Sequence, residues 1–95
     1  MFEDLSMNIY ALKGHKVKAT SLNQGYQYHI ENAEKYLKLN HIYTVDRTEV
    51  ASSKTEVYLQ EFPEIPFNST MFDDVVPQSA EDDRKHPDYY EFNNK

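Results

Sequence analysis

The 95-residue chain has a formal net charge of −6 and contains 8 Tyr and 5 Phe but neither Trp nor Cys. A chain of this length forms one small domain, whose limited core must depend on its aromatic rings. The absence of cysteine excludes disulfides, thiolate catalysis and cysteine-ligated zinc, and the negative charge disfavours binding to a phosphate backbone. The sequence has no bilayer-length apolar run and no secretory signal pattern, so we expect a cytoplasmic protein without a membrane span.

The first predicted element is a helix over residues 1–14. Phe2, Leu5, Ile9 and Leu12 recur every three or four residues, which places them on one helical stripe. Gly14 follows as a stop signal, because glycine tolerates the left-handed backbone conformation that ends many helices. A helix this short is marginal alone, so we expect the stripe to dock on the remaining chain, a second copy or a partner.

Residues 16–22 alternate between polar and small apolar side chains and predict a half-buried strand. A turn is expected at residues 23–25, with Gly25 at a positive φ. Residues 26–38 are ambiguous, because an alternating start is followed by helical spacing. We predict a short strand over residues 26–30, then one or two helical turns capped by Asn32 and ended by Asn40.

Residues 41–50 form the clearest strand pattern, rich in β-branched and aromatic side chains. Alternation places Tyr43, Val45 and Arg47 on one face. A polar link at 51–54 leads to a return strand over residues 55–61, with Val57 and Leu59 facing inward. The link has hairpin length, so the two strands are expected to pair.

The segment FPEIPF at residues 62–67 contains two prolines, which cannot donate to a strand ladder. It is therefore predicted to be a corner rather than a strand, with its apolar side chains folded back onto the core. Asn68 or Ser69 is expected to cap one turn that carries Met71 and Phe72 inward.

The composition changes after Phe72. Residues 73–95 hold seven acids and three bases, whereas residues 1–72 hold nine acids and seven bases. With two prolines and no sustained period, residues 76–95 are predicted to be an acidic tail that is flexible or loosely attached. Its aromatic cluster, Tyr89, Tyr90 and Phe92, either is a docking segment, or packs back on the barrel or stays solvated.

Two stretches of the middle, LKLNHIYTV and TEVYLQEFPEIPFNSTMFDDV, resemble small proteins encoded by phages and prophages with the pattern YTV…VYLxEFP…FNSxxF. The resemblance covers about Val17 to Val75. It implies an SH3-like β-barrel at residues 15–75, within a mainly β (α+β) fold, and a mobile-element accessory role. It carries over no catalytic residue. Asn40 stands where the relatives usually have Gly, and the N-terminal stripe and acidic tail are additions to the pattern.

The sequence offers no convincing reactive group. The four histidines, His15, His29, His41 and His86, have no metal-ligand spacing. The chain contains neither a nucleophile elbow nor a phosphate-binding loop. We therefore expect no catalytic residue, no metal, no cofactor and no enzymatic activity.

The leading hypothesis is a phage or mobile-element protein that binds and modulates or inhibits a host protein, such as a defence or nucleic-acid-handling factor. Its acids would occupy a basic surface, as a mimic of DNA would. The candidate acidic residues are Asp73, Asp74, Glu81, Asp82, Asp83, Asp88 and Glu91. The candidate apolar anchors are Phe2, Leu5, Ile9, Leu12, Tyr89, Tyr90 and Phe92.

Two alternatives remain open at this point. A nucleic-acid-binding barrel would use basic side chains beside stacking rings. Its candidates are Lys13, Lys16, Lys18, Tyr26, Tyr28, Lys35 and Lys38. A structural self-assembly module would instead use the N-terminal stripe as the seam of a homodimer.

Overall fold

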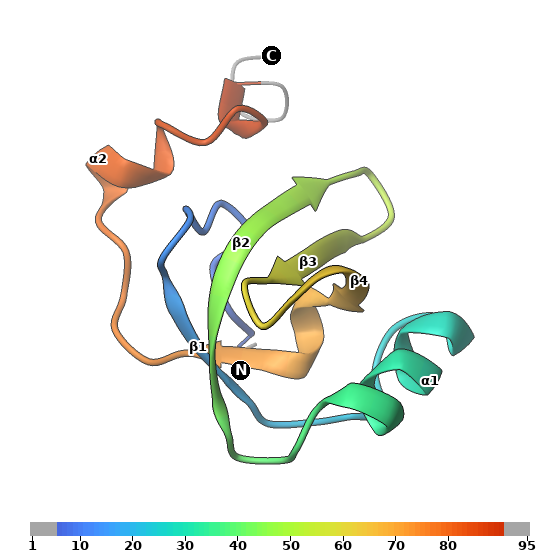
Figure 1. Ribbon diagram of the computed structural model, residues 1–95. Coiled ribbons are helices and arrows are strands. Elements are labelled where there is room, and N and C mark those ends of the chain that lie inside the picture. The colour runs from blue at the N-terminus through green and yellow to red at the C-terminus, as the bar shows by residue number, and fades with distance from the viewer. Residues whose placement is uncertain (1–5, 91–95) are drawn as a thin grey trace, which may run out of the picture.

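The computed structural model describes residues 6–90 and is built around one antiparallel sheet (Figure 1). Its five strands lie in the order β4-β3-β2-β1-β5, so the predicted mainly β (α+β) class is confirmed. The elements are β1 (Lys16–Ala19), α1 (Gln27–Tyr36), β2 (Ile42–Val50), β3 (Thr55–Leu59), β4 (Phe62–Asn68), the 3₁₀ turn η1 (Ser69–Met71), β5 (Phe72–Asp74) and α2 (Ala80–Asp83).

The core lies on the inner face of the bent sheet. Its fully buried side chains include Val17, Val45, Leu59, Phe67 and Phe72. Several predictions from alternation are confirmed, because β1 and β3 bury every second residue. The predicted cap is also confirmed, since the Asn68 side chain accepts from the backbone N–H of Thr70 at 3.0 Å.

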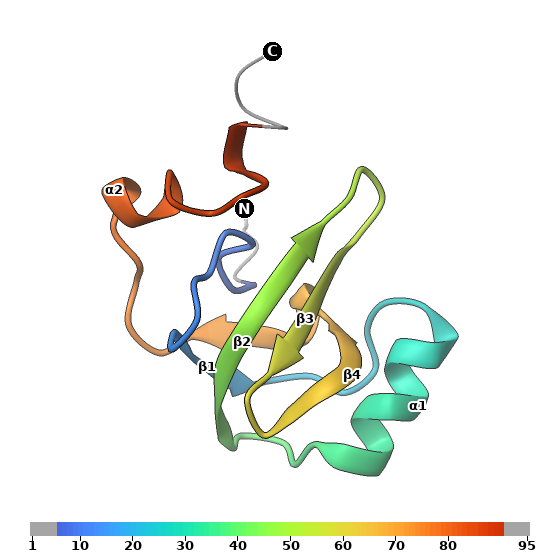
Figure 2. The same ribbon diagram turned by 45° about the horizontal axis from the view of Figure 1, so that its top comes forward.

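The predicted face of Arg47 is wrong, because β2 contains a bulge. Tyr43 and Val45 are buried as expected, but Arg47 is exposed and Thr48 takes the next inward position. The pairing of β2 with β3 shifts register between Val45 and Arg47, which moves later side chains to the opposite face. The first part of β2 pairs with β1 and the later part with β3, so β2 bends as it passes between them (Figure 2).

The predicted corner at residues 62–67 is wrong, because these residues form β4. Proline is tolerated there since β4 is an edge strand and its outward positions need no ladder donor. Helix α1 contacts β4, and the Asn32 amide donates to the Pro66 carbonyl oxygen at 2.9 Å. Asn32 therefore lies inside α1 and links it to β4, and it is not the predicted cap.

Helix α1 also replaces the short strand predicted at 26–30. Its buried positions, His29 and Ala33, are four residues apart, and the buried C-cap residue Leu37 follows at the same spacing, as on one face of a helix. Tyr26 is the N-cap of this helix and Tyr28 lies in its first turn, and both rings are exposed, so their alternation does not mark a strand. The left-handed positions are confirmed, with φ of 88° at Gly25 and 70° at Asn40.

The described part of the predicted N-terminal helix, residues 6–14, consists of turns and chain without regular secondary structure. The Asn8 side chain accepts from the backbone N–H of Tyr10 at 2.8 Å, a local bond that competes with helix formation. The backbone N–H of Met7 instead donates to the Phe72 carbonyl oxygen at 2.7 Å. The prediction is therefore wrong for these residues, and Phe2 and Leu5 lie outside the described range.

The sheet does not close into the predicted SH3-like barrel. Among residues 6–90 the strand order ends at β4 on one side and β5 on the other, with no pairing between them. Residues 7 and 8 cover the β5 edge, while α1 lies along β4. Both edges are thus protected against pairing with another chain.

The acidic tail is attached as far as residue 90. It leaves β5, forms α2 and then returns to the later part of β2, away from α1 (Figure 1). His86 is only 4% exposed, and its Nε2 lies 2.6 Å from the Thr48 hydroxyl. The prediction of a loose tail is wrong for residues 76–90, whereas Glu91 and Phe92 lie outside the described residues.

Candidate functional site

The most distinctive surface groups three tyrosines with one carboxylate that binds two of them. We call Tyr26, Tyr28, Tyr58 and Glu56 the tyrosine face. The first two come from the start of α1 and the others from β3. Tyr26 and Tyr28 are 46% and 40% exposed, and their rings meet edge to face with centroids 6.1 Å apart. Two large rings are therefore presented to solvent in a fixed arrangement.

Glu56 holds the tyrosine face together. The hydroxyl of Tyr28 donates to its Oε2 atom, and the hydroxyl of Tyr58 donates to Oε1 at 3.1 Å. Nε2 of His29 lies 3.3 Å from Oε2. One carboxylate thus accepts from three side chains and ties α1 to β3.

His29 lies beneath the tyrosine face and is fully buried. Its Nδ1 accepts from the backbone N–H of Tyr26 at 3.1 Å, which leaves Nε2 as the atom that donates to Glu56. This bond satisfies one of the free N–H groups at the start of α1. Burial lowers the pKa of His29 despite the hydrogen bond to Glu56, so the ring is neutral at pH 7.

The same network shifts the ionisation of its other members. Burial alone would raise the pKa of Glu56, but hydrogen bonds from Tyr28, Tyr58 and His29 outweigh it and lower that pKa. The hydrogen bond to Glu56 raises the pKa of Tyr28 to about 12. Glu56 therefore stays ionised while Tyr28 and Tyr58, whose pKa values are raised, stay neutral across the physiological range.

Two cations lie against the rings. Nζ of Lys54 lies 5.5 Å from the ring centroid of Tyr26, and the Arg47 guanidinium carbon lies 4.0 Å from that of Tyr58. Both distances suit cation–π attraction. Sequence reasoning missed both cations, because Lys54 is distant in sequence from Tyr26, and Arg47 meets Tyr58 only across the β2–β3 pairing.

The lysines predicted to bind nucleic acid are distributed over other parts of the molecule. Lys13 pairs with Asp46 at 3.5 Å, and Lys16 donates to the Thr44 hydroxyl at 2.6 Å. Lys35 lies over the Tyr36 ring. Lys18 is exposed on β1 and Lys38 follows α1. No contact within residues 6–90 joins these lysines to Tyr26 or Tyr28.

Most predicted acidic residues serve the fold. The Asp74 carboxylate accepts from the backbone N–H of Asn8 and contacts His15 Nε2 at 2.6 Å. Asp83 accepts from the Asn8 and Gln78 amides, and Asp88 accepts from a β2 backbone N–H. Asp82 pairs with Lys85, while Asp73 is half-buried on β5 and Glu81 is exposed.

The described apolar anchors do not form one surface. Ile9 and Leu12 are half-buried in the N-terminal segment, and Tyr89 is half-buried against the Tyr10 ring. Tyr90 is 55% exposed at the end of the described chain. The predicted helix that would place Ile9 and Leu12 on one stripe with Phe2 and Leu5 is absent from residues 6–14.

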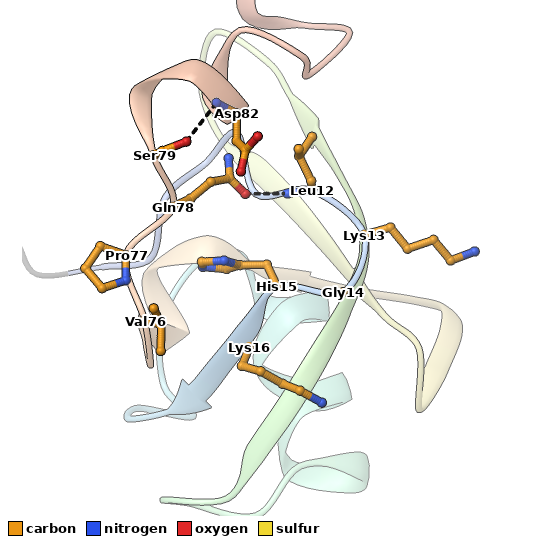
Figure 3. A pocket seen from close by; sticks show the side chains of 10 residues that line it. All are labelled: Leu12, Lys13, Gly14, His15, Lys16, Val76, Pro77, Gln78, Ser79 and Asp82. Atoms are coloured by element: carbon orange, nitrogen blue, oxygen red, sulfur yellow. Dashed lines mark hydrogen bonds between the residues drawn. The ribbon is translucent and has the colours of Figure 1, made fainter.

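A hollow of about 500 Å³ lies where the chain entering β1 meets the segment before α2 (Figure 3). The Gln78 side chain accepts from the backbone N–H of Leu12 at 3.0 Å, and Ser79 accepts from that of Asp82. Lys13 and Lys16 extend away from the hollow in this view. Its polar groups thus bind one another and hold the tail to the domain.

Residues 6–90 contain no group of three or more His, Asp or Glu side chains placed to hold a metal ion. In the same residues, no helix is both long and apolar enough to cross a membrane.

Comparison with known proteins gives one family. Residues 8–95 match the family described as bacteriophage T4 protein Y07B. The chain belongs to this family. The phage part of the sequence resemblance is thereby confirmed, and the acidic tail falls within the match rather than being an addition. No curated protein and no solved structure matches the chain.

Proposed function

We propose that this member of a phage protein family is a cytoplasmic, non-enzymatic accessory protein that binds and modulates a host protein through the tyrosine face. The observation that carries the proposal is the paired exposure of Tyr26 and Tyr28 beside Glu56, which accepts hydrogen bonds from Tyr28, Tyr58 and His29. Exposed aromatic rings with polar tips are typical centres of protein interfaces. Rings already fixed in place lose little entropy when a partner binds.

The same geometry argues for binding rather than catalysis. Both Glu56 oxygens already accept hydrogen bonds, and a carboxylate engaged in this way is a poor general base. His29 is fully buried beneath the rings, so its imidazole is screened from a substrate. The network stabilises the positions of the rings and leaves no free acid–base pair.

Charge supplies long-range steering toward the partner. The net charge of −6 favours a partner with a basic surface. The acids of the tail contribute to this field, although Asp74, Asp83 and Asp88 also hold the chain together. We therefore propose that the tyrosine face makes the contact with the partner and that the overall charge speeds the approach of the two proteins.

We also propose that the bent sheet is a small SH3-like scaffold in its topology. The meander with β1 between β2 and β5, the bend in β2 and the single 3₁₀ turn before β5 support this assignment. Such a scaffold holds exposed side chains rigidly and needs no cleft of its own.

The test is affinity capture from host lysate followed by measurement with the captured protein. We expect Tyr26→Ala to weaken that binding by at least about tenfold, the effect of losing an interface hot spot. Leu39→Ala is the matched control, because Leu39 is 53% exposed outside the tyrosine face. Equal capture by wild type and Tyr26→Ala, with both proteins folded, would remove the proposal.

Single-stranded nucleic acid is a second candidate, favoured by Lys54 and Arg47 against stacking rings. It predicts saturable, salt-dependent binding of an oligonucleotide that both Tyr26→Ala and Lys54→Gln reduce. Binding of this kind without capture of a host protein would replace the first proposal. The helical stripe that was the proposed interface of a self-assembled homodimer does not form within residues 6–14, because these residues form no helix.

A further inference from the structure

A second hollow, of about 550 Å³, lies beside the tyrosine face and shares Tyr26 with it. It is bounded by the turn between β2 and β3, the loop before α1, the chain at η1, and Ser6 and Ile9 of the N-terminal segment. Its polar lining includes Gln24, Lys54, Thr55, Asn68, Ser69 and Thr70. These residues come from three separate parts of the sequence, so only the fold brings them together.

Three of these side chains are buried and have polar atoms without a partner among residues 6–90. Thr55 and Ser69 are 6% and 5% exposed, and neither hydroxyl makes a hydrogen bond within residues 6–90. Asn68 is 6% exposed; its Oδ1 accepts from both the N–H and the hydroxyl of Thr70, whereas its Nδ2 has no acceptor in that range. Buried polar atoms in native proteins are normally bonded, so this cluster indicates an external acceptor.

The charge of this hollow differs from that of the protein. Lys54 is the only charged residue among the described residues that line it, and no carboxylate does. This is unusual in a chain of net charge −6. Glu49 and Glu56 lie near Lys54, but they line a separate, smaller hollow on its other side. Lys54 forms no ion pair with either of them.

We propose that this hollow binds an oxyanion, a carboxylate or phosphate group carried on a small polar molecule. The Lys54 ammonium supplies one positive charge, and the Thr55 hydroxyl, the Ser69 hydroxyl and the Asn68 amide supply neutral donors. Charge-assisted bonds to an oxyanion are stronger than neutral ones and would satisfy the buried groups together. The volume exceeds that of a bare ion and lies in the range of small-molecule sites.

The experiment is a titration of isotope-labelled full-length protein with inorganic phosphate and, in a second arm, with acetate. Amide shifts are followed by NMR at constant ionic strength maintained with chloride. We expect saturable shifts at Lys54, Thr55, Ser69 and Thr70, and the stronger arm tells which oxyanion the hollow prefers. Lys54→Gln should weaken the binding by at least about tenfold, as expected for loss of a charged hydrogen-bond donor. Lys35→Gln, which changes a lysine on α1 away from this lining, should leave the affinity unchanged.

Thr55→Val separates a ligand-binding role from a structural one. If the hydroxyl has no protein partner, its replacement by a methyl group keeps the melting temperature or raises it while anion affinity falls. Shifts that chloride reproduces, or that persist in Lys54→Gln, would overturn the proposal. So would an absence of saturable shifts in both arms, which would mean that water alone occupies the hollow. None of these outcomes depends on whether the tyrosine face binds a protein.

Discussion

The Asp88 carboxylate accepts a hydrogen bond from the backbone N–H of Val50 at 3.0 Å. This bond lies on the later part of β2, beyond the residues that pair with β1. At the other end of β2, Glu61 accepts from the backbone N–H of Thr44 at 3.1 Å. At both places a side-chain carboxylate accepts the backbone hydrogen bond that a neighbouring strand would otherwise accept. Through Asp88, the tail thus satisfies a backbone N–H of β2 that no strand pairs.

We expect Asp88→Ala to destabilise the protein by about 1–2 kcal/mol, because a partly buried N–H group loses its acceptor. Urea unfolding followed by circular dichroism measures this change. Asp88→Asn should recover part of the loss, since the amide oxygen still accepts. Glu81→Ala, at an exposed residue of the same tail, should stay within about 0.5 kcal/mol of wild type. Equal stability of all four proteins would show that the bond contributes nothing.

We expect the protein to lose stability in mild acid because of His86. Burial lowers the pKa of His86, so the unfolded chain binds a proton more readily than the folded one. Its contribution is present above the unfolded pKa, about 6.5, and declines as pH falls below it toward the lowered folded pKa. His29 acts in the same direction, since burial lowers its pKa too.

The check is the urea midpoint at several pH values between neutral and mildly acidic. In His86→Gln the midpoint should change less steeply with pH, even if the variant is less stable throughout. A variant with the wild-type slope would show that protonation of His86 is not linked to unfolding.

Glu56→Gln should loosen the tyrosine face. We expect a loss of about 1.5–3 kcal/mol, because the bonds that it weakens involve a charged acceptor. Without the carboxylate, the pKa of Tyr28 should fall from about 12 toward its ordinary value, which ultraviolet titration of tyrosinate detects. Glu34→Gln is the control, since Glu34 is an exposed residue of α1. An unchanged tyrosine titration in Glu56→Gln would contradict the hydrogen-bond network.

The two glycines offer a matched pair. Both have positive φ, 96° at Gly14 and 88° at Gly25, so alanine at either position costs about 1 kcal/mol of backbone strain. At Gly25 an added Cβ would also lie 2.6 Å from the Asn68 Nδ2 atom, whereas at Gly14 it meets nothing within 4 Å. Gly25→Ala should therefore lower the melting temperature more than Gly14→Ala. The reverse order would be inconsistent with the close approach of Asn68.

Local patterns predicted the centre of the sheet because they report burial directly. Val17, Val57 and Leu59 alternate with polar residues, and each faces the core as expected. The same reasoning failed at Arg47, since a bulge shifts the register there. It also failed at residues 62–67, where the prolines are compatible with a strand only because β4 lies at the edge.

The candidate site was less predictable, because its members are distant in sequence. Tyr26 and Tyr28 were noted as possible stacking residues, but Glu56 contacts Tyr28 and Lys54 contacts Tyr26 only when the fold brings the start of α1 to the start of β3. The acids of the tail were assigned to a partner on composition alone. In the fold, Asp74, Asp83 and Asp88 bind backbone or amide groups of segments about 40 to 75 residues away.

By itself the sequence determined a small, acidic, cysteine-free chain with a β-rich middle and left-handed turns at Gly25 and Asn40, because composition and short-range periodicity set those features. Only the tertiary structure decided that residues 6–14 form turns and irregular chain, that Asp88 of the tail binds the backbone of β2, and that Tyr28 and Tyr58 donate to Glu56. These outcomes depend on hydrogen bonds between segments far apart in the chain. Such bonds satisfy backbone and side-chain groups that no local pattern identifies.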